Sequence, residues 1–590
     1  MQNYKKLWYL LNPHERKLAG LLLFMITIMA LLDMIGVASI LPFMSVVANP
    51  ETIETNYYLK NIFEFSQKFG VDDKQDFIFI LGFLVFIALV ISIVFKALTT
   101  YVQVRFIHMR EYSIGKRLVE VYLNQPYSWF LGRHSADLSK TILSEVGNVV
   151  GAALKPLVEL IAKSFVVIAI VTLLIIVDPK LTLIVGFSLA SIYALIFYFS
   201  RNYLNQVGKE RLRNNELRFK ILSDAFGATK EIKLGRLEQI YVDLFSIPAQ
   251  KFAKNKSSAT IIGQLPRFAL EVVVFGGVIL VLLYLLRQTG NFSSALPVIT
   301  LYVLAGYRLM PALQQIYLSS TLLVFQGPTL DKLYDEITKL KDFDLNQDHN
   351  ILSADKKISL KNVFYSYPDS SRTALRNISL NISAKSIVGI MGTTGSGKTT
   401  VADIILGLLE VQKGTLQVDE KIITKNNVKS WQRSIGYVPQ NIYLSDNTIA
   451  ANIAFGVNSN HINQKAVEEA SKIANLHEFV INELPEKYLT YIGERGARLS
   501  GGQRQRIGIA RALYRKPKLL ILDEATNALD YQTEKVVMEA VSNLDKNITI
   551  IIIAHNLRAL KKCDKIFLLD KGELKEEGTF EKLVEKNNNF

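Results

Sequence analysis

Long apolar runs alternate with charged segments over the first 325 residues of the chain. Each run is longer than a buried helix of a globular protein requires, and each can cross about 30 Å of hydrocarbon. The runs predict membrane-spanning helices at about residues 18–45, 77–104, 150–177, 179–200, 265–286 and 296–325. Little more than Asp178 and Pro179 separates the third run from the fourth, which predicts a tight helical hairpin.

The charged segments between the runs predict how the helices are oriented. Residues 105–149 hold six Lys and Arg and residues 201–267 hold thirteen, whereas residues 46–76 hold three against six acidic residues. Cytoplasmic loops carry the excess of Lys and Arg. We therefore expect the N-terminus, both basic segments and everything after residue 325 to lie in the cytoplasm. The basic segments are rich in helix-forming residues, so the helices are expected to continue beyond the bilayer.

The external segment 51–70 has two interpretations. Tyr57, Tyr58, Ile62 and Phe65 stand among polar neighbours, as in a short amphipathic helix lying on the outer membrane surface. An ordinary external loop fits the same residues. The pattern alone leaves both open.

The hydrophobic pattern changes near residue 326. A polar, charge-rich linker is expected at 326–357, after a transmembrane domain at 1–325. From 358 to 590, short apolar runs alternate with helical patterns and glycine-rich turns. This alternation predicts a soluble α/β domain.

Composition narrows the function classes. The net charge is +15, but the basic residues lie mostly between the apolar runs, so they indicate membrane orientation rather than nucleic-acid binding. The single cysteine, Cys563, excludes a disulfide framework within the chain. We expect it to be an ordinary buried thiol.

A phosphate-binding loop follows the first buried strand of the α/β domain. The run Val388–Met391 leads into a segment that fits this loop at every position, where backbone N–H groups and the start of a helix face the phosphates. Lys398 would reach the β and γ phosphates, and the Thr399 hydroxyl would bind Mg²⁺. The expected ATP-binding residues here are Gly392, Thr393, Thr394, Gly395, Ser396, Gly397, Lys398, Thr399 and Thr400.

Two further segments carry candidate chemistry. The apolar strand 519–522 ends in Asp523 and Glu524; the first would hold Mg²⁺, and the second would act as a general base or orient the attacking water. Ser500, Gly501, Gly502 and Gln503 precede a helix and predict a second anion site. Because one nucleotide does not need two phosphate sites in one domain, the second site indicates a partner.

Taken together, these motifs resemble those of the ABC transporter family over essentially the whole chain. The family's motifs follow in order as Tyr367, 392–399, Gln440, 499–503, Asp523–Glu524, 527–530 and His555. The resemblance implies a membrane domain of the exporter fold followed by an α/β ATPase domain. It also implies that Tyr367 stacks on adenine, that Asp530 belongs to the ATP site, and that His555 contacts the γ phosphate. Gln440 would link Mg²⁺ and the attacking water to the contact with the membrane domain.

The same resemblance implies a head-to-tail dimer, in which the phosphate loop of one chain and the segment 499–503 of the other enclose each ATP. Every catalytic motif is intact, so we expect a homodimer with two competent sites, although a heterodimer stays open. Asn527 and Asn556 depart from the family's usual Ser and Arg. These departures bear on the fine tuning of the hydrolysis rate or of the coupling within the dimer, and not on the activity itself. Residues 110–140 and 223–240 would contain the helices that dock on the ATPase domains.

Charges inside the predicted spans are the clue to the cargo, because charged residues there usually face a wet cavity. Lys155, Glu159 and Lys163 share one helix face and are expected to pair, as are Arg267 and Glu271. Lys96 and Arg308 have no local partner of opposite sign in the sequence, which makes them candidate contacts for an anionic cargo. Pairing across helices is the alternative.

The membrane segment is similar to bacterial flippases of lipid-linked oligosaccharides, notably in residues 33–36, 41–44 and 307–311. This similarity implies ATP-driven flipping or export across the bacterial cytoplasmic membrane, in polysaccharide or glycoprotein assembly. The expected partners are a second copy of the chain, membrane lipids and an amphipathic or lipid-linked substrate, without nucleic acid. A multidrug, general lipid or peptide exporter remains open, as does an ATP-gated channel or regulator. A peptide exporter with an N-terminal cysteine protease is not expected, because the first span starts near residue 18.

Overall fold

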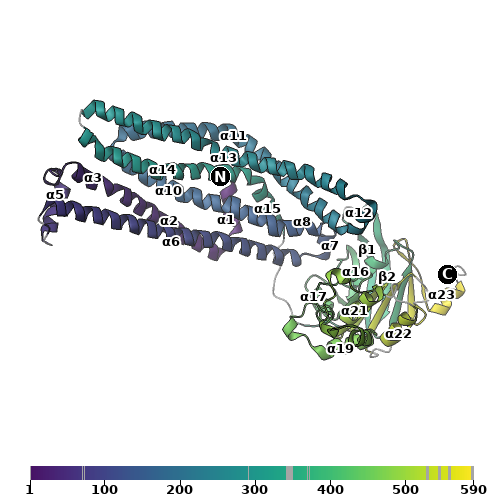
Figure 1. Cartoon of the computed structure of the whole chain (residues 1–590). Helices are drawn as coiled ribbons and strands as arrows, with labels where there is room; N and C mark the ends of the chain where they lie inside the picture. The colour runs from purple at the N-terminus through teal and green to yellow at the C-terminus, as the bar shows by residue number, and fades with distance from the viewer. Residues whose placement is uncertain are drawn as a thin grey trace. The chain divides into compact units, whose positions relative to one another are not determined.

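Long helices make up one unit of the chain, and a mixed α/β fold makes up the other (Figure 1). The computed structural model places Met1–Gln125 and Arg133–Asp342 in unit 1 and Pro126–Gly132 and Phe343–Phe590 in unit 2. The structure describes residues 2–68, 71, 73–289, 292–340, 350–368, 370, 372–525, 531–542, 547–555 and 560–586. The two units are described separately below.

Unit 1 is helical over its described residues. Its helices are α1 (Gln2–Leu10), α2 (Pro13–Ala38), α3 (Ile40–Ala48), α4 (Thr52–Thr55), α5 (Tyr57–Gln67), α6 (Lys74–Leu123), α8 (Ser135–Lys140), α9 (Val146–Val149), α10 (Lys155–Val177), α11 (Pro179–Gly227), α12 (Thr229–Gly235), α13 (Glu238–Thr289), α14 (Phe292–Phe325) and α15 (Gly327–Lys339). Two π-helical segments, η1 (Thr141–Glu145) and η2 (Val150–Leu154), interrupt the helical run before α10. The long helices lie side by side, with α2 on α6, α10 on α14 and α11 on α13 (Figure 1).

Each of the predicted membrane spans lies in a helical stretch. Within the described part of the chain, four helical stretches are long and apolar enough to cross a membrane: Pro13–Ala48, Lys74–Leu123, Ser135–Val177 and Thr182–Gly227. An 18-residue segment in each has a mean hydropathy of 2.5, 3.2, 2.9 and 2.0, respectively. The predicted spans 265–286 and 296–325 lie within α13 and α14. Many side chains between residues 269 and 299 are outside the described set.

The first predicted span is broken, which the sequence pattern did not indicate. It is divided at Ser39 into α2 and α3. Pro42 lies in the first turn of α3 and cannot donate a backbone hydrogen bond to the preceding turn, which favours a helix boundary here. The predicted hairpin at Asp178 is present, because α10 ends at Val177 and α11 begins at Pro179.

The basic segments continue the long helices, as expected. Helices α6, α11 and α13 have 50, 49 and 52 residues, more than the roughly 20 residues that cross a bilayer. The segment 51–70 contains the helix α5, whose Tyr57, Tyr58 and Phe65 side chains are exposed. Of the two interpretations of that segment, the structure has the helix.

The predicted linker 326–357 contains the helix α15. Leu330, Leu333 and Ile337 on one face of α15 are buried, and the helix contacts α1 and α11 of unit 1. Lys6 of α1 pairs with Asp331 at 2.7 Å. This part of the linker is therefore packed into the helical unit.

Two sheets form the framework of unit 2. One has the order β2 (Thr373–Ser383), β1 (Lys357–Ser366), β4 (Lys413–Val418), β5 (Lys421–Ile422) and is antiparallel. The other has the order β10 (Glu573–Gly578), β9 (Lys565–Asp570), β3 (Ile387–Gly392), β8 (Thr549–Ala554), β7 (Leu519–Asp523), β6 (Ile435–Val438). The helices are α7 (Tyr127–Leu131), α16 (Lys398–Ile405), α17 (Val428–Gln432), α18 (Ile449–Ile453), α19 (Gln464–Ile473), α20 (His477–Glu483), α21 (Gly501–Tyr514), α22 (Tyr531–Ser542) and α23 (Phe580–Lys586).

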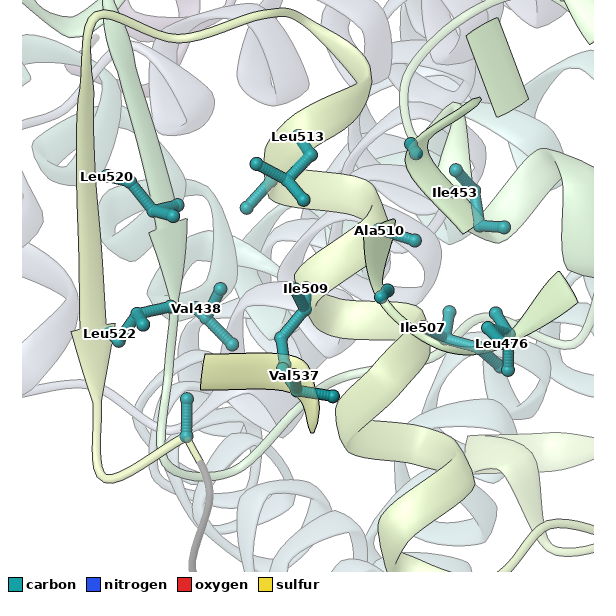
Figure 2. Close-up of a cluster of buried hydrophobic side chains, with 14 of the residues drawn as sticks. Val438, Ile453, Leu476, Ile507, Ile509, Ala510, Leu513, Leu520, Leu522 and Val537 are labelled. Atoms are coloured by element: carbon teal, nitrogen blue, oxygen red, sulfur yellow. The ribbon is translucent and has the colours of Figure 1, made fainter. Parts of the chain in front are cut away.

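Helix α21 lies at the centre of one core of unit 2. Its Ile509 and Leu513 face Val438, Leu520 and Leu522 of the strands (Figure 2). Its Ile507 and Ala510 pack toward Leu476 and Ile453 (Figure 2). Cys563 is buried in the same core, as predicted, and burial raises the pKa of its thiol to about 12.

Candidate functional site

Four parallel strands bring the predicted catalytic residues to one edge of the six-stranded sheet. Strands β3, β8, β7 and β6 are neighbours in that order and run parallel. The carboxyl ends of parallel strands share one edge, where α/β sheets bind ligands. The phosphate-binding loop, His555, the Asp523–Glu524 pair and Gln440 follow these four strands in turn.

The phosphate-binding loop has a backbone that only glycine fits at two positions. A Cβ on Gly392 would lie 2.3 Å from the Leu569 carbonyl oxygen and 2.5 Å from Ser396 Oγ. Gly397 is the N-cap of α16 and has φ +101°, a conformation that other residues rarely adopt. The loop therefore turns directly into the helix start, where backbone N–H groups attract anions.

Side chains of the loop divide into exposed and buried ones. Thr393, Thr394 and Thr399 are exposed, whereas Ser396 and Thr400 are buried. The Lys398 ammonium donates to the carbonyl oxygens of Gly392 and Thr393 at 2.8 and 3.1 Å. The lysine thus curls over its own loop, within reach of any phosphate that the loop holds.

Tyr367, the predicted adenine-stacking residue, lies beside the first turn of α16. Its hydroxyl and the Thr400 hydroxyl are 3.1 Å apart and share a hydrogen bond. Its ring meets the Tyr365 ring edge-on, with centroids 5.2 Å apart. Thr400 was expected among the ATP-binding residues, and its buried side chain links the helix to Tyr367.

Asp523 is a buried carboxylate at the end of β7. The Tyr437 hydroxyl donates to Asp523 Oδ2 at 3.4 Å. Burial, followed by the negative charge of Glu524, raises the pKa of Asp523. A carboxylate in this position favours a cation beside it, because a cation offsets both effects.

Glu524 connects the remaining catalytic candidates. Gln440 Nε2 donates to Glu524 Oε2 at 2.7 Å, and His555 Nδ1 lies 3.7 Å from Glu524 Oε1. The Glu524 backbone is in the left-handed region at φ +50°, and its N–H donates to the Ile553 carbonyl at 3.0 Å. Strained backbone of this kind is concentrated at functional sites. The structure thus joins three residues from different parts of the sequence, with Gln440 lying 84 positions before Glu524.

The oxygen donors at this edge fit Mg²⁺ bound together with a nucleotide. Thr399, Gln440 and Asp523 supply hydroxyl, amide and carboxylate oxygens, which Mg²⁺ prefers. Over the described residues, no group of three His, Cys, Asp or Glu side chains forms a metal cage. Mg²⁺ commonly takes one or two carboxylates and completes its shell with substrate phosphates and water, so the sparse donor set agrees with this mode.

Asp403 is a site residue that the motifs did not reveal. It lies on α16, one turn after Thr399, and is 8% exposed. Burial and, to a smaller extent, the charge of Asp523 raise its pKa to about 6. The available sequence signal was a single carboxylate among the apolar residues Val401–Ile405.

The segment 500–503 forms the start of α21. Ser500 is the N-cap; its Oγ accepts from the Gln503 N–H at 3.2 Å, and its own N–H donates to Gln503 Oε1 at 2.8 Å. This capping box fixes the helix start, and the predicted anion site is therefore an ordered helix N-terminus. Asn527, Asp530 and Asn556 lie outside the described residues.

The two candidate cargo cations, Lys96 and Arg308, are paired with a carboxylate on another helix. Arg308 Nη1 donates to Asp33 Oδ1 at 2.9 Å, and Lys96 Nζ lies 3.7 Å from Asp33 Oδ2. Of the two interpretations of Lys96 and Arg308, the structure has the pairing across helices, because α2 brings Asp33 between α6 and α14. Sequence spacing cannot show such a contact. Whether the two cations contact cargo stays a prediction.

Two expected local pairs are present. Lys155 Nζ lies 3.9 Å from Glu159 Oε1, and Arg267 Nε lies 3.0 Å from Glu271 Oε1. Glu159 also accepts from Gln315 Nε2 of α14 at 2.6 Å. The polar residues of α10 and α14 therefore contact each other.

Comparisons with known proteins cover both units. The family model for the ABC transporter transmembrane region matches residues 18–316, and the ABC transporter model matches residues 375–527. An ATP-dependent lipid A-core flippase of Syntrophus aciditrophicus is 42% identical over 235 residues, which is 40% of this chain and 38% of that protein. The chain thus spans well under half of that relative.

Other relatives match over longer stretches. The lipid A-core flippase of Wigglesworthia glossinidia brevipalpis is 29% identical over 80% of this chain and 81% of its own length. The leukotoxin translocation protein LktB of Mannheimia haemolytica is 30% identical over 85% of this chain and 70% of its own length.

A solved structure supports the fold. A bacterial Atm1-family ABC exporter with ATP bound matches with a TM-score of 0.77 at 20% identity, over 95% of this chain and 96% of that one. The predicted fold class, a helical transmembrane domain of exporter type followed by an α/β ATPase domain, is confirmed. The chain is a multi-pass membrane protein that belongs to the ABC transporter family and joins an exporter-type membrane region to its ATPase domain.

Proposed function

We propose that two copies of this chain form an exporter that hydrolyses ATP with Mg²⁺ and flips a lipid-linked oligosaccharide across the bacterial cytoplasmic membrane. The observation that carries the ATPase part is the junction of Gln440, Glu524 and His555 at the sheet edge that also bears the phosphate-binding loop. The membrane unit and its paired charges support the transport part.

The proposed hydrolysis follows from this geometry. The loop 392–397 and the start of α16 bind the phosphates, and Lys398 leaves its own carbonyl partners to meet them. Thr399, Gln440 and Asp523 would hold Mg²⁺, which neutralises charge on the phosphates. Glu524 orients the attacking water and accepts its proton, while His555 donates toward the γ phosphate.

Gln440 has two possible partners in this scheme. It donates to Glu524 in the structure, and its amide oxygen can turn toward Mg²⁺. A change of partner would make the hydrogen bond from Gln440 to Glu524 depend on whether a nucleotide is bound.

A second copy is needed to complete each site. Ser500 and Gln503 cap α21 and present a helix start, whereas the phosphate loop has its own at α16. In the proposed head-to-tail dimer, the α21 start of one chain covers the nucleotide on the other, so that two sites are shared between two chains.

The proposed cargo is an amphipath with an anionic headgroup. Asp33, Lys96 and Arg308 carry a net charge of one positive unit, and charged groups at membrane depth usually face a wet pathway. A polyprenyl diphosphate would meet these cations through charge-assisted hydrogen bonds. The exposed aromatic residues of α5 would lie at the outer membrane surface.

A polypeptide cargo is the second candidate. It is favoured by the likeness to LktB, which extends over 85% of this chain. A polypeptide needs a hydrated path with broad polar contacts, and the membrane unit also supplies Glu159, Lys163 and Gln315.

The test is the stimulation of ATP turnover in liposomes by a cargo panel. Purified protein is assayed with a lipid-linked oligosaccharide, with polyprenyl monophosphate, with phosphatidylethanolamine alone and with an unfolded polypeptide. The proposal predicts stimulation by the first compound above all others. Stimulation by the polypeptide alone would replace it with the second candidate.

A further inference from the structure

Asp33 is a buried carboxylate inside the membrane unit. It is 2% exposed and sits on α2 between Met29 and Val37, which belong to an apolar cluster with residues of α10 and α14. Burying an isolated carboxylate in such surroundings is costly. The position therefore requires partners, and α6 and α14 supply them.

Three side chains satisfy Asp33. The Ser92 hydroxyl donates to Asp33 Oδ1 at 3.0 Å, and Arg308 Nη1 donates to the same oxygen at 2.9 Å. Lys96 Nζ lies 3.7 Å from Oδ2. One anion thus holds two cations that come from two different helices.

The cations are more accessible than the anion that holds them. The side chains of Lys96 and Arg308 are 37% and 20% exposed, against 2% for Asp33. Arg308 has five N–H donors, of which Asp33 takes one. Both cations therefore keep donors for a second anion, while Asp33 stays beneath them.

Further charged residues lie near this trio. Lys163 of α10 lies within electrostatic range of Lys96, Asp33, Glu159 and Arg308. Glu159 is itself engaged by Lys155 and Gln315. Around Asp33 the two cations that contact it outnumber it, so an arriving anion is attracted but meets one resident negative charge.

We infer that Asp33 is the built-in counter-anion of the cargo site, which holds Lys96 and Arg308 in place between transport cycles and weakens their grip on the cargo's anion so that it can be released. The inference rests on the proposed function, because it assumes an anionic headgroup. Asp33 is buried and stays in contact with Lys96 and Arg308 when cargo binds. Asp33 and the anion of the cargo therefore share the two cations.

This arrangement suits a transporter rather than a storage site. A pathway must bind its substrate well enough for entry and weakly enough for exit. Without Asp33 the two cations would hold a diphosphate more tightly, and release would limit turnover. Asp33 thus acts as a positioning residue that lowers the affinity of Lys96 and Arg308 for the cargo and so speeds its release.

The experiment measures ATP turnover in phosphatidylethanolamine liposomes as a function of added C55 polyprenyl diphosphate. In Asp33→Asn the half-saturating concentration should fall about tenfold, because removing one nearby negative charge is worth at least that factor in a partly buried site. The maximal stimulated rate should fall as well. Ser92→Ala is the matched control, since it removes the hydroxyl contact and keeps the charge.

A charge-restoring variant separates this role from a structural one. Asp33→Asn combined with Lys96→Gln has the same net charge as the native trio, and its half-saturating concentration should lie above that of Asp33→Asn. If Asp33→Asn does not assemble, the double variant is compared with Lys96→Gln alone, and the inference then predicts the lower half-saturating concentration for the double variant. A lower maximal rate with an unchanged or higher half-saturating concentration would overturn the inference.

Failure of the proposed cargo gives a different pattern. If the unmodified protein responds to the anionic lipid phosphatidylglycerol but not to polyprenyl diphosphate, the oligosaccharide proposal fails, and the same titration with phosphatidylglycerol decides the role of Asp33. Inorganic pyrophosphate serves as the control for a headgroup without a lipid. A response to neutral compounds alone would overturn both the proposed cargo and the inferred role of Asp33.

Discussion

Glu524 is the residue on which the proposed hydrolysis depends most. Gln440 and His555 both lie against its carboxylate, and Glu524→Gln keeps the shape while removing the base. Because a positioned base contributes about 10²–10⁴-fold to a rate, we expect ATP turnover to fall by at least about a hundredfold. ATP affinity, measured with a fluorescent analogue, should change little.

Glu573→Gln provides the matched control, since Glu573 is exposed on β10. It should turn over ATP at the unmodified rate. Retention of turnover in Glu524→Gln would show that a residue other than Glu524 is the general base.

Asp403 predicts a pH dependence of stability. Its pKa is raised to about 6 by burial and then by the charge of Asp523, so its contribution to stability is fully present below pH 3.8 and is lost as the pH rises through about 6. At pH 8, Asp403→Asn should raise the free energy of unfolding by about 2 kcal/mol. At pH 4 the gain should vanish. Denaturant unfolding without nucleotide measures both.

Asp419 should behave in the opposite way. Although burial acts to raise its pKa, the backbone N–H groups of Lys357, Asp355 and Lys356 outweigh burial, and the pKa is lowered. Asp419→Asn should therefore destabilise the protein at pH 8 and lose its effect as the pH falls through the lowered pKa. Equal responses of the two variants to pH would contradict this electrostatic account.

Sequence reasoning at the residue scale worked where chemistry follows a strand. The Asp523–Glu524 pair and the phosphate loop stand directly after apolar runs, so their shared edge was predictable. The role of Asp403 was not predictable, because it depends on which face of α16 is buried. The contact of Asp33 with Arg308 was not predictable either, because it joins positions 275 residues apart. Periodicity carries no information about either.

The strand–loop–helix element around Gly392 has no room for a larger side chain. In Gly392→Ala the added Cβ would meet the Leu569 carbonyl oxygen at 2.3 Å, and backbone cannot yield as a flexible side chain does. We expect about 1–3 kcal/mol of destabilisation and at least about a tenfold loss of ATP affinity as the loop shifts.

Gly20→Ala in α2 is the control, since its Cβ would meet nothing within 4 Å. Calorimetry of nucleotide binding together with thermal unfolding compares the two variants. Native ATP affinity in Gly392→Ala would show that the loop rearranges freely.

The remaining elements show what hydrophobic runs can and cannot predict. Run length placed each predicted span in a helical stretch, because a membrane requires about 20 apolar residues in sequence. The break at Ser39 and the π-helical segments η1 and η2 depend on single residues and packing. Helix α15 was expected as linker, because only three of its five buried residues, Leu330, Leu333 and Ile337, are large and apolar.

At the scale of the whole molecule, the head-to-tail dimer makes a prediction about mixed chains. Lys398→Ala destroys the phosphate loop of one chain, and Ser500→Arg blocks the α21 start of the other. In a mixed dimer both defects fall in one shared site, and the second site stays intact. Co-expression should therefore restore ATP turnover that neither variant shows alone.

Differently tagged chains, purified in two steps, isolate the mixed dimer. Recovery to about half of the native rate is expected, because one of two sites works. Absence of recovery in the purified mixed dimer would mean that each chain builds its site alone or that both sites must act together.

The most direct test of the central claim follows headgroup movement across a bilayer. Liposomes containing the purified protein and a fluorescent lipid-linked oligosaccharide receive ATP and Mg²⁺, and an impermeant quencher reports which leaflet holds the headgroup. The account predicts ATP-dependent movement that Glu524→Gln abolishes. Brisk ATP turnover without any headgroup movement would contradict the proposed cargo, and movement that persists in Glu524→Gln would contradict coupling to hydrolysis.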